Sequence, residues 1–231
     1  MSVEDLNAQA WTVYGQRQLT HGYLPPIPQH MNWSPWNDVG PGTEILGDLA
    51  GRRILDIGSG PGHHAVHLAQ DHGALVTGVE LSPTQYERAV SAHADVTGVK
   101  FVHGDVVGFL QRAEPFDAAY AVGTLAFIDP YRVLPALSDG LRPGAPLILS
   151  LLHTDLHGRG PTSTVEPREQ MVRLRDDPPL PTRMWVLAPH VWEDLLTAHG
   201  FRIGSIDLLR SPTEGVLNVQ QLIRATRSNA D

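Results

Sequence analysis

The pattern most able to do chemistry is the run Asp56-Ile57-Gly58-Ser59-Gly60-Pro61-Gly62. Glycine reaches positive φ without strain and lets a ligand approach the backbone closely. A helical pattern begins at His63, and the free N–H groups of a helix N-terminus favour a carboxylate or a phosphate. Together these features predict a cofactor pocket on a turn from strand to helix.

Two common glycine loops do not fit this run. A dinucleotide fingerprint needs a third glycine where His63 stands, and a phosphate-binding P-loop needs a lysine followed by serine or threonine. A nicotinamide-dependent oxidoreductase is therefore disfavoured, also because the chain lacks a recognisable catalytic tyrosine and lysine pair.

Two acidic residues stand where strands are expected to end. Glu80 closes the apolar stretch 74–80 and comes 20 residues beyond Gly60, a spacing at which an acid can accept hydrogen bonds from ribose hydroxyls. A solvated strand-end acid is the plainer alternative. Asp105 follows the stretch 99–103, where aspartate also suits a plain helix N-cap.

Strand and helix patterns alternate between residues 53 and 152, which predicts right-handed βαβ units and a parallel sheet. Ligands of such sheets bind outside the carboxyl ends of the strands, where the glycine run and both acids fall. The expected strands are 53–57, 74–80, 99–103, 116–122 and 146–152, and the expected helices are 62–72, 83–93, 106–109 and 130–140.

The whole chain, 1–231, is expected to form one domain around the cofactor-binding core at 52–152. Residues 1–51 carry three of the five tryptophans and are expected to form a helix over 3–15 and then a strap or lid. Residues 153–185 are rich in proline, with one amphipathic piece at 166–174, and predict an irregular insertion on the substrate side. Residues 186–231 predict a helix at 189–199 and an antiparallel strand pair, 201–209 and 216–225.

The order of these features resembles that of the class I S-adenosylmethionine-dependent methyltransferases. The resemblance covers residues 56–226 and rests on the glycine run, Glu80, Asp105 and Leu141-Arg142-Pro143-Gly144. It implies an α/β fold, a Rossmann-like doubly wound sheet of seven strands. The sheet would be mostly parallel with a final antiparallel strand, and helices would cover both faces.

The resemblance also implies roles for single residues. Asp105 and the next backbone N–H would hold the adenine, Leu81 would cover one face of its ring, and Asp56 would fix the loop backbone. An ordinary core leucine would look the same as Leu81. Tyr14 is a candidate contact from the lid. The expected cofactor-binding residues are Tyr14, Asp56, Gly58, Ser59, Gly60, Gly62, Glu80, Leu81, Asp105, Val106, Ala121 and Val122.

The implied reaction is an in-line transfer of a methyl group to O, N or C of a small molecule, leaving S-adenosylhomocysteine. His153, just past the strand 146–152, is the candidate general base, since an imidazole titrates near neutral pH. A loop histidine paired with Asp155 is the alternative. A protein of the same fold that binds S-adenosylmethionine without transferring methyl, as a cyclase or a regulatory module, stays open.

Composition narrows the partners. The 231 residues carry a net charge of −8, whereas nucleic-acid binders usually show a basic face, so we expect a small-molecule substrate and no nucleic acid. No apolar run reaches the length of a membrane span, and no signal peptide is apparent, so we expect a cytoplasmic monomer or homodimer.

A metal site is not expected. With no cysteine, a metal could use only histidine or carboxylate ligands. His63 and His67, and separately His153 and His157, have the i, i+4 spacing of two ligands on one helix face, but neither pair has an obvious third ligand.

The acceptor is predicted only in part. The aromatic strap and the insertion resemble those of bacterial methyltransferases of secondary metabolism. Residues 122–125, Val-Gly-Thr-Leu, differ from the Asn/Asp-Pro-Pro-Tyr/Phe motif of DNA amino-methylating enzymes. That specificity therefore has no support in the sequence.

Overall fold

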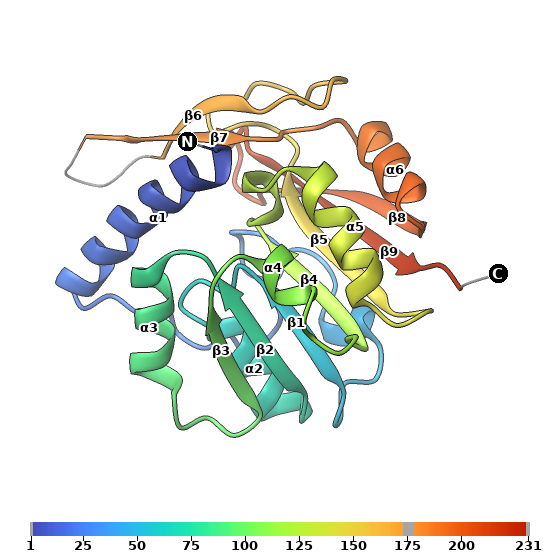
Figure 1. Cartoon of the computed structure of the whole chain (residues 1–231). Helices are drawn as coiled ribbons and strands as arrows, with labels where there is room; N and C mark the ends of the chain where they lie inside the picture. Colours follow the sequence, from blue (N-terminus) through green and yellow to red (C-terminus); the bar gives the residue numbers. More distant parts are fainter. Residues whose placement is uncertain (1, 173–177, 230–231) are drawn as a thin grey trace.

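The computed structural model describes residues 2–172 and 178–229. It is built on a seven-stranded sheet with the strand order β3-β2-β1-β4-β5-β9-β8 (Figure 1). These strands are β1 (Arg53–Ile57), β2 (Leu75–Glu80), β3 (Val99–His103), β4 (Ala118–Val122), β5 (Pro146–Leu152), β8 (Phe201–Arg210) and β9 (Val219–Arg227).

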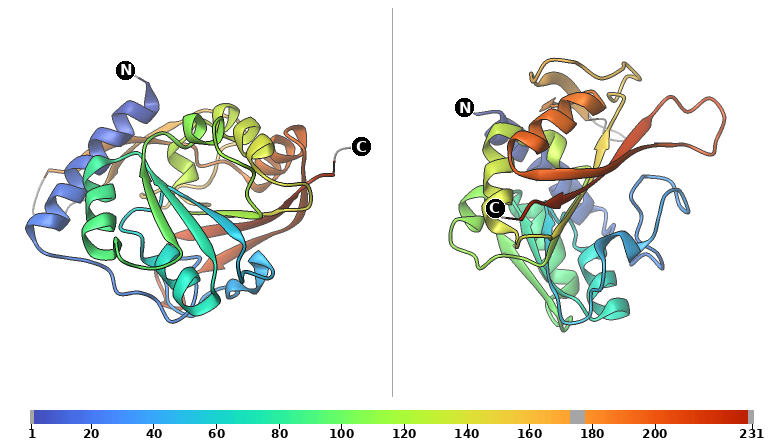
Figure 2. Two further views of the ribbon diagram at one scale, coloured as in Figure 1. Left: turned by 60° about the horizontal axis from the view of Figure 1, so that its bottom comes forward. Right: turned by 90° about the vertical axis from the view of Figure 1, so that its right-hand side faces the viewer.

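The pairing matches the predicted fold class. Strands β1 to β5 pair in parallel, whereas β9 runs antiparallel to both of its neighbours, β5 and β8. The α/β sheet with one reversed strand is therefore confirmed. The connection between β8 and β9 projects from the body of the molecule (Figure 2).

Helices cover both faces of the sheet, as the views in Figure 2 show. Consecutive β1 residues point to opposite faces, and Leu55 and Ile54 accordingly enter two different apolar clusters. The helices are α1 (Val3–Thr20), α2 (His63–His72), α3 (Pro83–His93), α4 (Val106–Leu110), α5 (Pro130–Gly140) and α6 (Pro189–Ala198), with short 3-10 turns η1 (Thr43–Leu46) and η2 (Leu125–Phe127).

The first helix is longer than the sequence predicts. It begins with a capping box between Ser2 and Asp5 and runs to Thr20, beyond the expected end at Gly15. A Cβ at Gly15 would overlap Thr84 Oγ1 of α3. The glycine therefore serves close packing of α1 on α3 instead of ending the helix.

The region expected to be irregular contains a strand pair. Strands β6 (Arg168–Val172) and β7 (Leu180–Met184) form an antiparallel two-stranded sheet beside the N-terminal half of α1. The amphipathic piece at 166–174 is thus a strand as far as Val172, and residues 173 and 174 lie outside the described residues. Proline content alone did not exclude a hairpin here.

Two strands also begin two or more residues later than the prediction. Strand β4 begins at Ala118, because Phe116 makes only an isolated bridge to Leu141. Strand β9 begins at Val219, three residues later than expected.

Candidate functional site

A cavity of about 360 Å³ lies at the carboxyl ends of β1, β2 and β4 and is roofed by α1. Its floor is the glycine loop, where Gly58, Gly60 and Gly62 take positive φ values of 66°, 53° and 83°. The backbone N–H of Gly58 donates to Val79 O at 2.8 Å, which fixes the loop to β2. The pattern of glycines thus reflects a backbone that other residues adopt only with strain.

The first and second glycines serve different needs. A Cβ at Gly58 would overlap Thr124, whose hydroxyl donates to Gly58 O at 3.1 Å. A Cβ at Gly60 would meet no atom within 4 Å. The loop packs tightly on the segment after β4 at one glycine and faces open space at the other.

Glu80 closes the loop from the end of β2. Its two carboxylate oxygens accept hydrogen bonds from the backbone N–H groups of Gly60 at 2.9 Å and Ser82 at 2.7 Å. Burial raises the pKa of Glu80, while these N–H donors oppose the rise. A carboxylate held by both oxygens at a cavity wall retains lone pairs for two further donors, such as vicinal hydroxyls.

Asp56 lies deeper, at the base of the cavity. Its side chain is 4% exposed and its Oδ2 atom has no hydrogen-bond partner among the described residues. Burial raises the pKa of Asp56 to about 7, the nearby phenol of Tyr120 counteracts part of the rise, and the charge of Glu80 adds to it. Among the described residues, Oδ2 makes no hydrogen bond to the loop backbone, so the expected role of Asp56 in fixing that backbone stays a prediction.

Asp105 caps α4 and also joins an ion-pair chain. Its Oδ2 accepts from the Gly108 N–H at 3.1 Å and from Arg132 at 3.3 Å. Arg132 reaches Glu4 of α1 at 3.0 Å with its other terminal nitrogen. Burial alone would raise the pKa of Glu4, but its backbone hydrogen bonds, including the Asp129 N–H, and Arg132 outweigh it and lower the pKa. Through Arg132, the roof helix α1 is thereby linked to Asp105, the residue predicted to bind the adenine.

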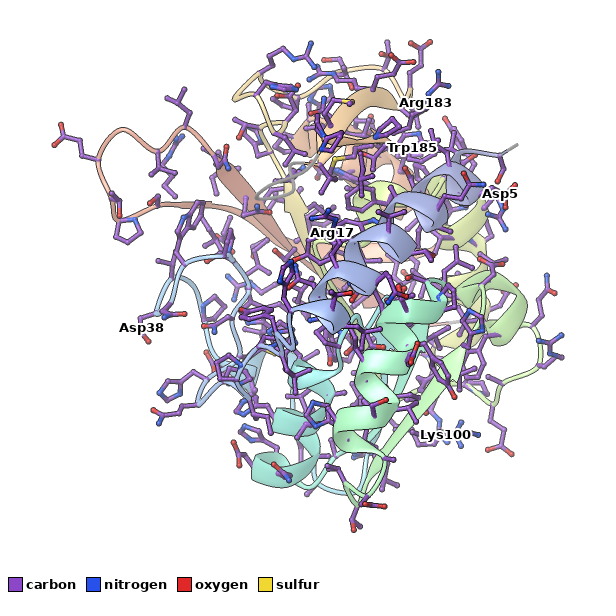
Figure 3. The ribbon with its side chains drawn as sticks, turned by 90° about the vertical axis from the view of Figure 1, so that its left-hand side faces the viewer. Asp5, Arg17, Asp38, Lys100, Arg183 and Trp185 are labelled. Atoms are coloured by element: carbon purple, nitrogen blue, oxygen red, sulfur yellow. The ribbon has the colours of Figure 1, made fainter. Side chains whose placement is uncertain are left out.

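A second tie holds α1 to the insertion. The Asn7 side chain donates to Phe127 O at 2.9 Å and to Arg183 O at 2.8 Å, and it accepts from the Arg183 N–H at 2.8 Å. Figure 3 shows Arg183 of β7 near the end of α1 that carries Asp5. The side chains that α1 buries are polar or small, namely those of Glu4, Asn7 and Ala10, together with Gly15.

Aromatic side chains complete the cavity beneath the roof. Trp11 of α1 meets Phe127 edge to face, with ring centroids 5.1 Å apart, and both line the cavity. Trp33 of the strap is instead fully buried in the core, and its indole N–H donates to Gly42 O at 3.2 Å. The N-terminal region thus combines a roof over the cavity with an aromatic strap that packs against the sheet.

Two histidines line the cavity at the start of α2. The rings of His63 and His64 lie 4.1 Å apart. Burial, followed by the charges of His93 and Arg88, lowers the pKa of His63 to about 4, and burial also lowers the pKa of His64 well below its usual range. Both imidazoles are therefore neutral near pH 7.

The structure brings most of the predicted cofactor residues to this one cavity. Their roles toward a cofactor stay predictions. The predicted residues that line it are Asp56, Gly58, Ser59, Gly60, Glu80, Leu81, Asp105, Val106 and Val122.

Four predicted residues do not line the cavity. Tyr14 packs against Trp11, with ring centroids 5.3 Å apart, Ala121 is fully buried in the core, and Gly62 caps α2 beneath Phe101. His153 follows β5 into its pairing with β9, where its N–H donates to Val219 O at 2.9 Å. Its expected partner Asp155 binds Arg159 and Gln170 instead.

Sequence reasoning missed the cavity residues that the roof helix α1, the start of α3 and the η2 segment supply. The capping box at Ser2 and Asp5 was the available signal for a helix start, but nothing local shows that this helix returns to the cavity. The missed lining residues include Glu4, Asn7, Trp11, Gln85, Thr124 and Phe127.

Neither a metal cluster nor a membrane helix is found among the described residues. No group of three or more histidine or acidic side chains there is arranged to hold a metal ion. His67, half of one candidate pair, contacts Asp71 at 2.8 Å. None of the helices in the described ranges is long and apolar enough to cross a membrane.

Comparisons with known proteins point to one family. Residues 54–144 match the model of a family described as a methyltransferase domain. The O-methyltransferase resE of Aspergillus sclerotiorum is 30% identical over 162 residues, which are 68% of this chain and 58% of that protein. The chain spans about half the length of the first curated relatives it matches.

Solved structures share the fold at low identity. The cyclase SpnF superposes with a TM-score of 0.70 at 17% identity, over 99% of this chain and 97% of that one. The glycopeptide N-methyltransferase MtfA, complexed with S-adenosylmethionine, gives a TM-score of 0.59 at 18% identity, over 78% of this chain and 88% of that one.

Proposed function

We propose that the chain is a class I S-adenosylmethionine-dependent methyltransferase that methylates a small molecule, a proposal supported by the match of residues 54–144 to the model of a methyltransferase domain. The observation that carries the proposal is the convergence of Gly60, Glu80 and Asp105 on one cavity. When bound there, S-adenosylmethionine supplies an electrophilic methyl group.

The charges of the lining fit that cofactor. Four carboxylates line the cavity, those of Glu4, Asp56, Glu80 and Asp105, and no lysine or arginine is among the described lining residues. The neutral rings of His63 and His64 add no positive charge that would repel a sulfonium. The orphaned Oδ2 of Asp56 gives a buried acceptor at the base.

Each of these residues has a definite task in the proposal. Glu80 accepts from the ribose hydroxyls, Asp105 accepts from the adenine amine, and the open side of Gly60 lets the cofactor approach the backbone. Trp11 and Phe127 hold an acceptor molecule beside the methyl group and exclude water. Since the lining is acidic, we infer an acceptor that is uncharged or cationic.

Positioning is the larger share of such catalysis. Holding two reactants in line is worth on the order of 7–11 kcal/mol, whereas a general base contributes about 10²–10⁴-fold in rate. His153 lies outside the cavity lining, so its predicted role as a base rests on its place in the chain. Unchanged turnover in His153→Ala would remove it from the mechanism.

The test combines binding with product analysis. Calorimetry with S-adenosylhomocysteine is expected to give binding by the wild type, weakened in Glu80→Gln and unchanged in Glu114→Gln, which alters an exposed acid paired with Arg53. Loss of one charge-assisted contact costs about 1.5–3 kcal/mol, or roughly 10- to 150-fold in affinity. Absence of binding by the wild type would overturn the cofactor assignment.

A second candidate is a protein of this fold that binds the cofactor without transferring methyl. This second candidate is supported by the superposition with the cyclase SpnF, which extends over 99% of this chain. Product mass separates the two, because methyl transfer adds one methyl group to the acceptor and yields S-adenosylhomocysteine. The acidic net charge of −8 favours a small molecule over nucleic acid in either case.

A further inference from the structure

Asp56 occupies an unusual position for an acid. Residues 54–57 of β1 are buried, and the strand pairing places Asp56 between Gly78 of β2 and Tyr120 of β4. The side chain nevertheless lines the cavity, and Oδ2 is left without a partner among the described residues. A buried carboxylate with an unpaired oxygen is costly, unless a proton or a ligand completes it.

Among the described residues, no lysine or arginine lines the cavity beside this carboxylate. Strand β2 contributes the acid Glu80, and β4 contributes the phenol of Tyr120, which lowers the pKa of Asp56. The start of α2 contributes His63 and His64, both neutral near pH 7. Across the cavity stand Glu4 and Asp105, and both are already paired with Arg132.

We propose that Asp56 distinguishes the charged cofactor from its demethylated product: it meets the sulfonium of S-adenosylmethionine as a carboxylate and the neutral thioether of S-adenosylhomocysteine as a carboxylic acid. The inference rests on the proposed function. It assigns Asp56 a role in choosing between the two ligands, beside the contacts of Glu80 and Asp105, which both ligands share. Loss of the sulfonium charge then allows Asp56 to take up a proton from solvent and removes the attraction that held the cofactor.

The expected size of the effect follows from the titration of Asp56. Its pKa of about 7 in the ligand-free protein leaves it almost fully ionised at pH 8.5, but only about one molecule in thirty is ionised at pH 5.5. The preference for S-adenosylmethionine over S-adenosylhomocysteine is therefore expected to fall by at least about 30-fold from pH 8.5 to pH 5.5. Groups that serve both ligands alike cancel from this ratio.

The experiment is calorimetry with both ligands across this pH range, in two buffers of different ionisation enthalpy. At pH 7 the wild type is expected to release about half a proton on binding S-adenosylmethionine and to take up as much as about half a proton on binding S-adenosylhomocysteine. In Asp56→Asn the ratio of the two affinities is expected to be independent of pH. The control Glu80→Gln is expected to weaken the binding of both ligands and to keep a pH-dependent ratio, with its midpoint moved to lower pH because the charge of Glu80 raises the pKa of Asp56.

Tyr120→Phe gives a test that keeps Asp56 in place. Because the Tyr120 phenol stabilises the carboxylate, its removal is expected to move the midpoint of the ratio to higher pH. If Asp56→Asn fails to fold, the inference is tested by Tyr120→Phe and by the number of protons that the wild type releases or takes up on binding each ligand. Wild-type binding of both ligands with a constant ratio would overturn the inference and leave the proposed function standing. Binding of neither ligand would overturn the proposed function itself.

Discussion

Asn7 and Arg183 exchange two hydrogen bonds across 176 residues of sequence, each 2.8 Å long. The Asn7 amide pairs with the backbone of β7 as a neighbouring strand would, and it gives its second amide hydrogen to Phe127 O. One side chain, 3% exposed, thus joins the roof helix, the insertion and the segment after β4.

Asn7→Asp is expected to loosen the roof. The variant keeps the acceptor for the Arg183 N–H but loses both donors, so two carbonyls lack their partner, and each such loss costs about 1–3 kcal/mol. Hydrogen exchange of the α1 amides should become faster, whereas amides of β1 and β4 should keep their rates. Unchanged exchange in α1 would contradict this account.

Arg132→Gln is expected to weaken the tie between the roof and Asp105. Arg132 is partly exposed, so its pair with Glu4 is worth roughly 0–1 kcal/mol, and the effect should shrink as salt is added. Proteolysis within α1, compared at low and high salt, measures it. Arg224→Gln is the control, because Arg224 pairs with Asp207 on the distant β8–β9 pair. Equal proteolysis of the two variants would refute the tie.

Alanine at the two loop glycines is expected to have opposite consequences. Gly58→Ala places a Cβ against Thr124 at a positive φ, so a lower melting temperature is expected. Gly60→Ala meets no protein atom, so its cost is about 1 kcal/mol of backbone strain, while the added methyl group obstructs the cavity. Thermal melting and cofactor calorimetry on both variants separate the effects. A well-bound cofactor in Gly60→Ala would count against the assigned floor.

The unfolding free energy of the ligand-free protein is expected to depend on pH through the titration of Asp56. Its pKa is about 7 when folded and near 3.9 when unfolded, so between about pH 4 and 7 the folded state holds the extra proton. Stability therefore falls as pH rises through this window, by about 1.4 kcal/mol per pH unit at most.

Comparison with Asp56→Asn isolates this contribution, because asparagine does not titrate. The unfolding free energy of the wild type minus that of the variant should fall from about pH 4 to pH 7 and level off above it. Denaturant titrations at several pH values measure the difference. A difference that rises with pH would contradict the burial of an ionisable Asp56.

The sequence predicted the half of the site that local patterns encode. The glycine run, Glu80 and Asp105 each follow a β-strand, and parallel strands bring their carboxyl ends together without any further information. The alternation of strands and helices likewise predicted the parallel sheet, whereas the doubly wound sheet of seven strands was implied by the family resemblance.

The other half depends on contacts between distant segments. Asn7 and Trp11 reach the cavity only because α1 packs on α3 and β7. No periodicity in the sequence of residues 3–20 predicts that packing. His153 was placed by the same rule that succeeded for Glu80, but β5 pairs with β9, and the residue beyond its end follows that pairing. A rule about strand ends does not tell which side chain turns toward the ligand.

The polar underside of α1 has a further consequence. Its fully buried side chains include no large apolar one, so the apolar area that α1 covers comes from partly exposed side chains such as Val3 on the core and Trp11 on Phe127. If the helix lifts to admit or release a ligand, the hydrogen bonds of Asn7 and the ion pair of Glu4 are exchanged for contacts with water, and the contact of Trp11 with Phe127 is lost. Opening the site therefore trades mainly polar contacts, which water can replace.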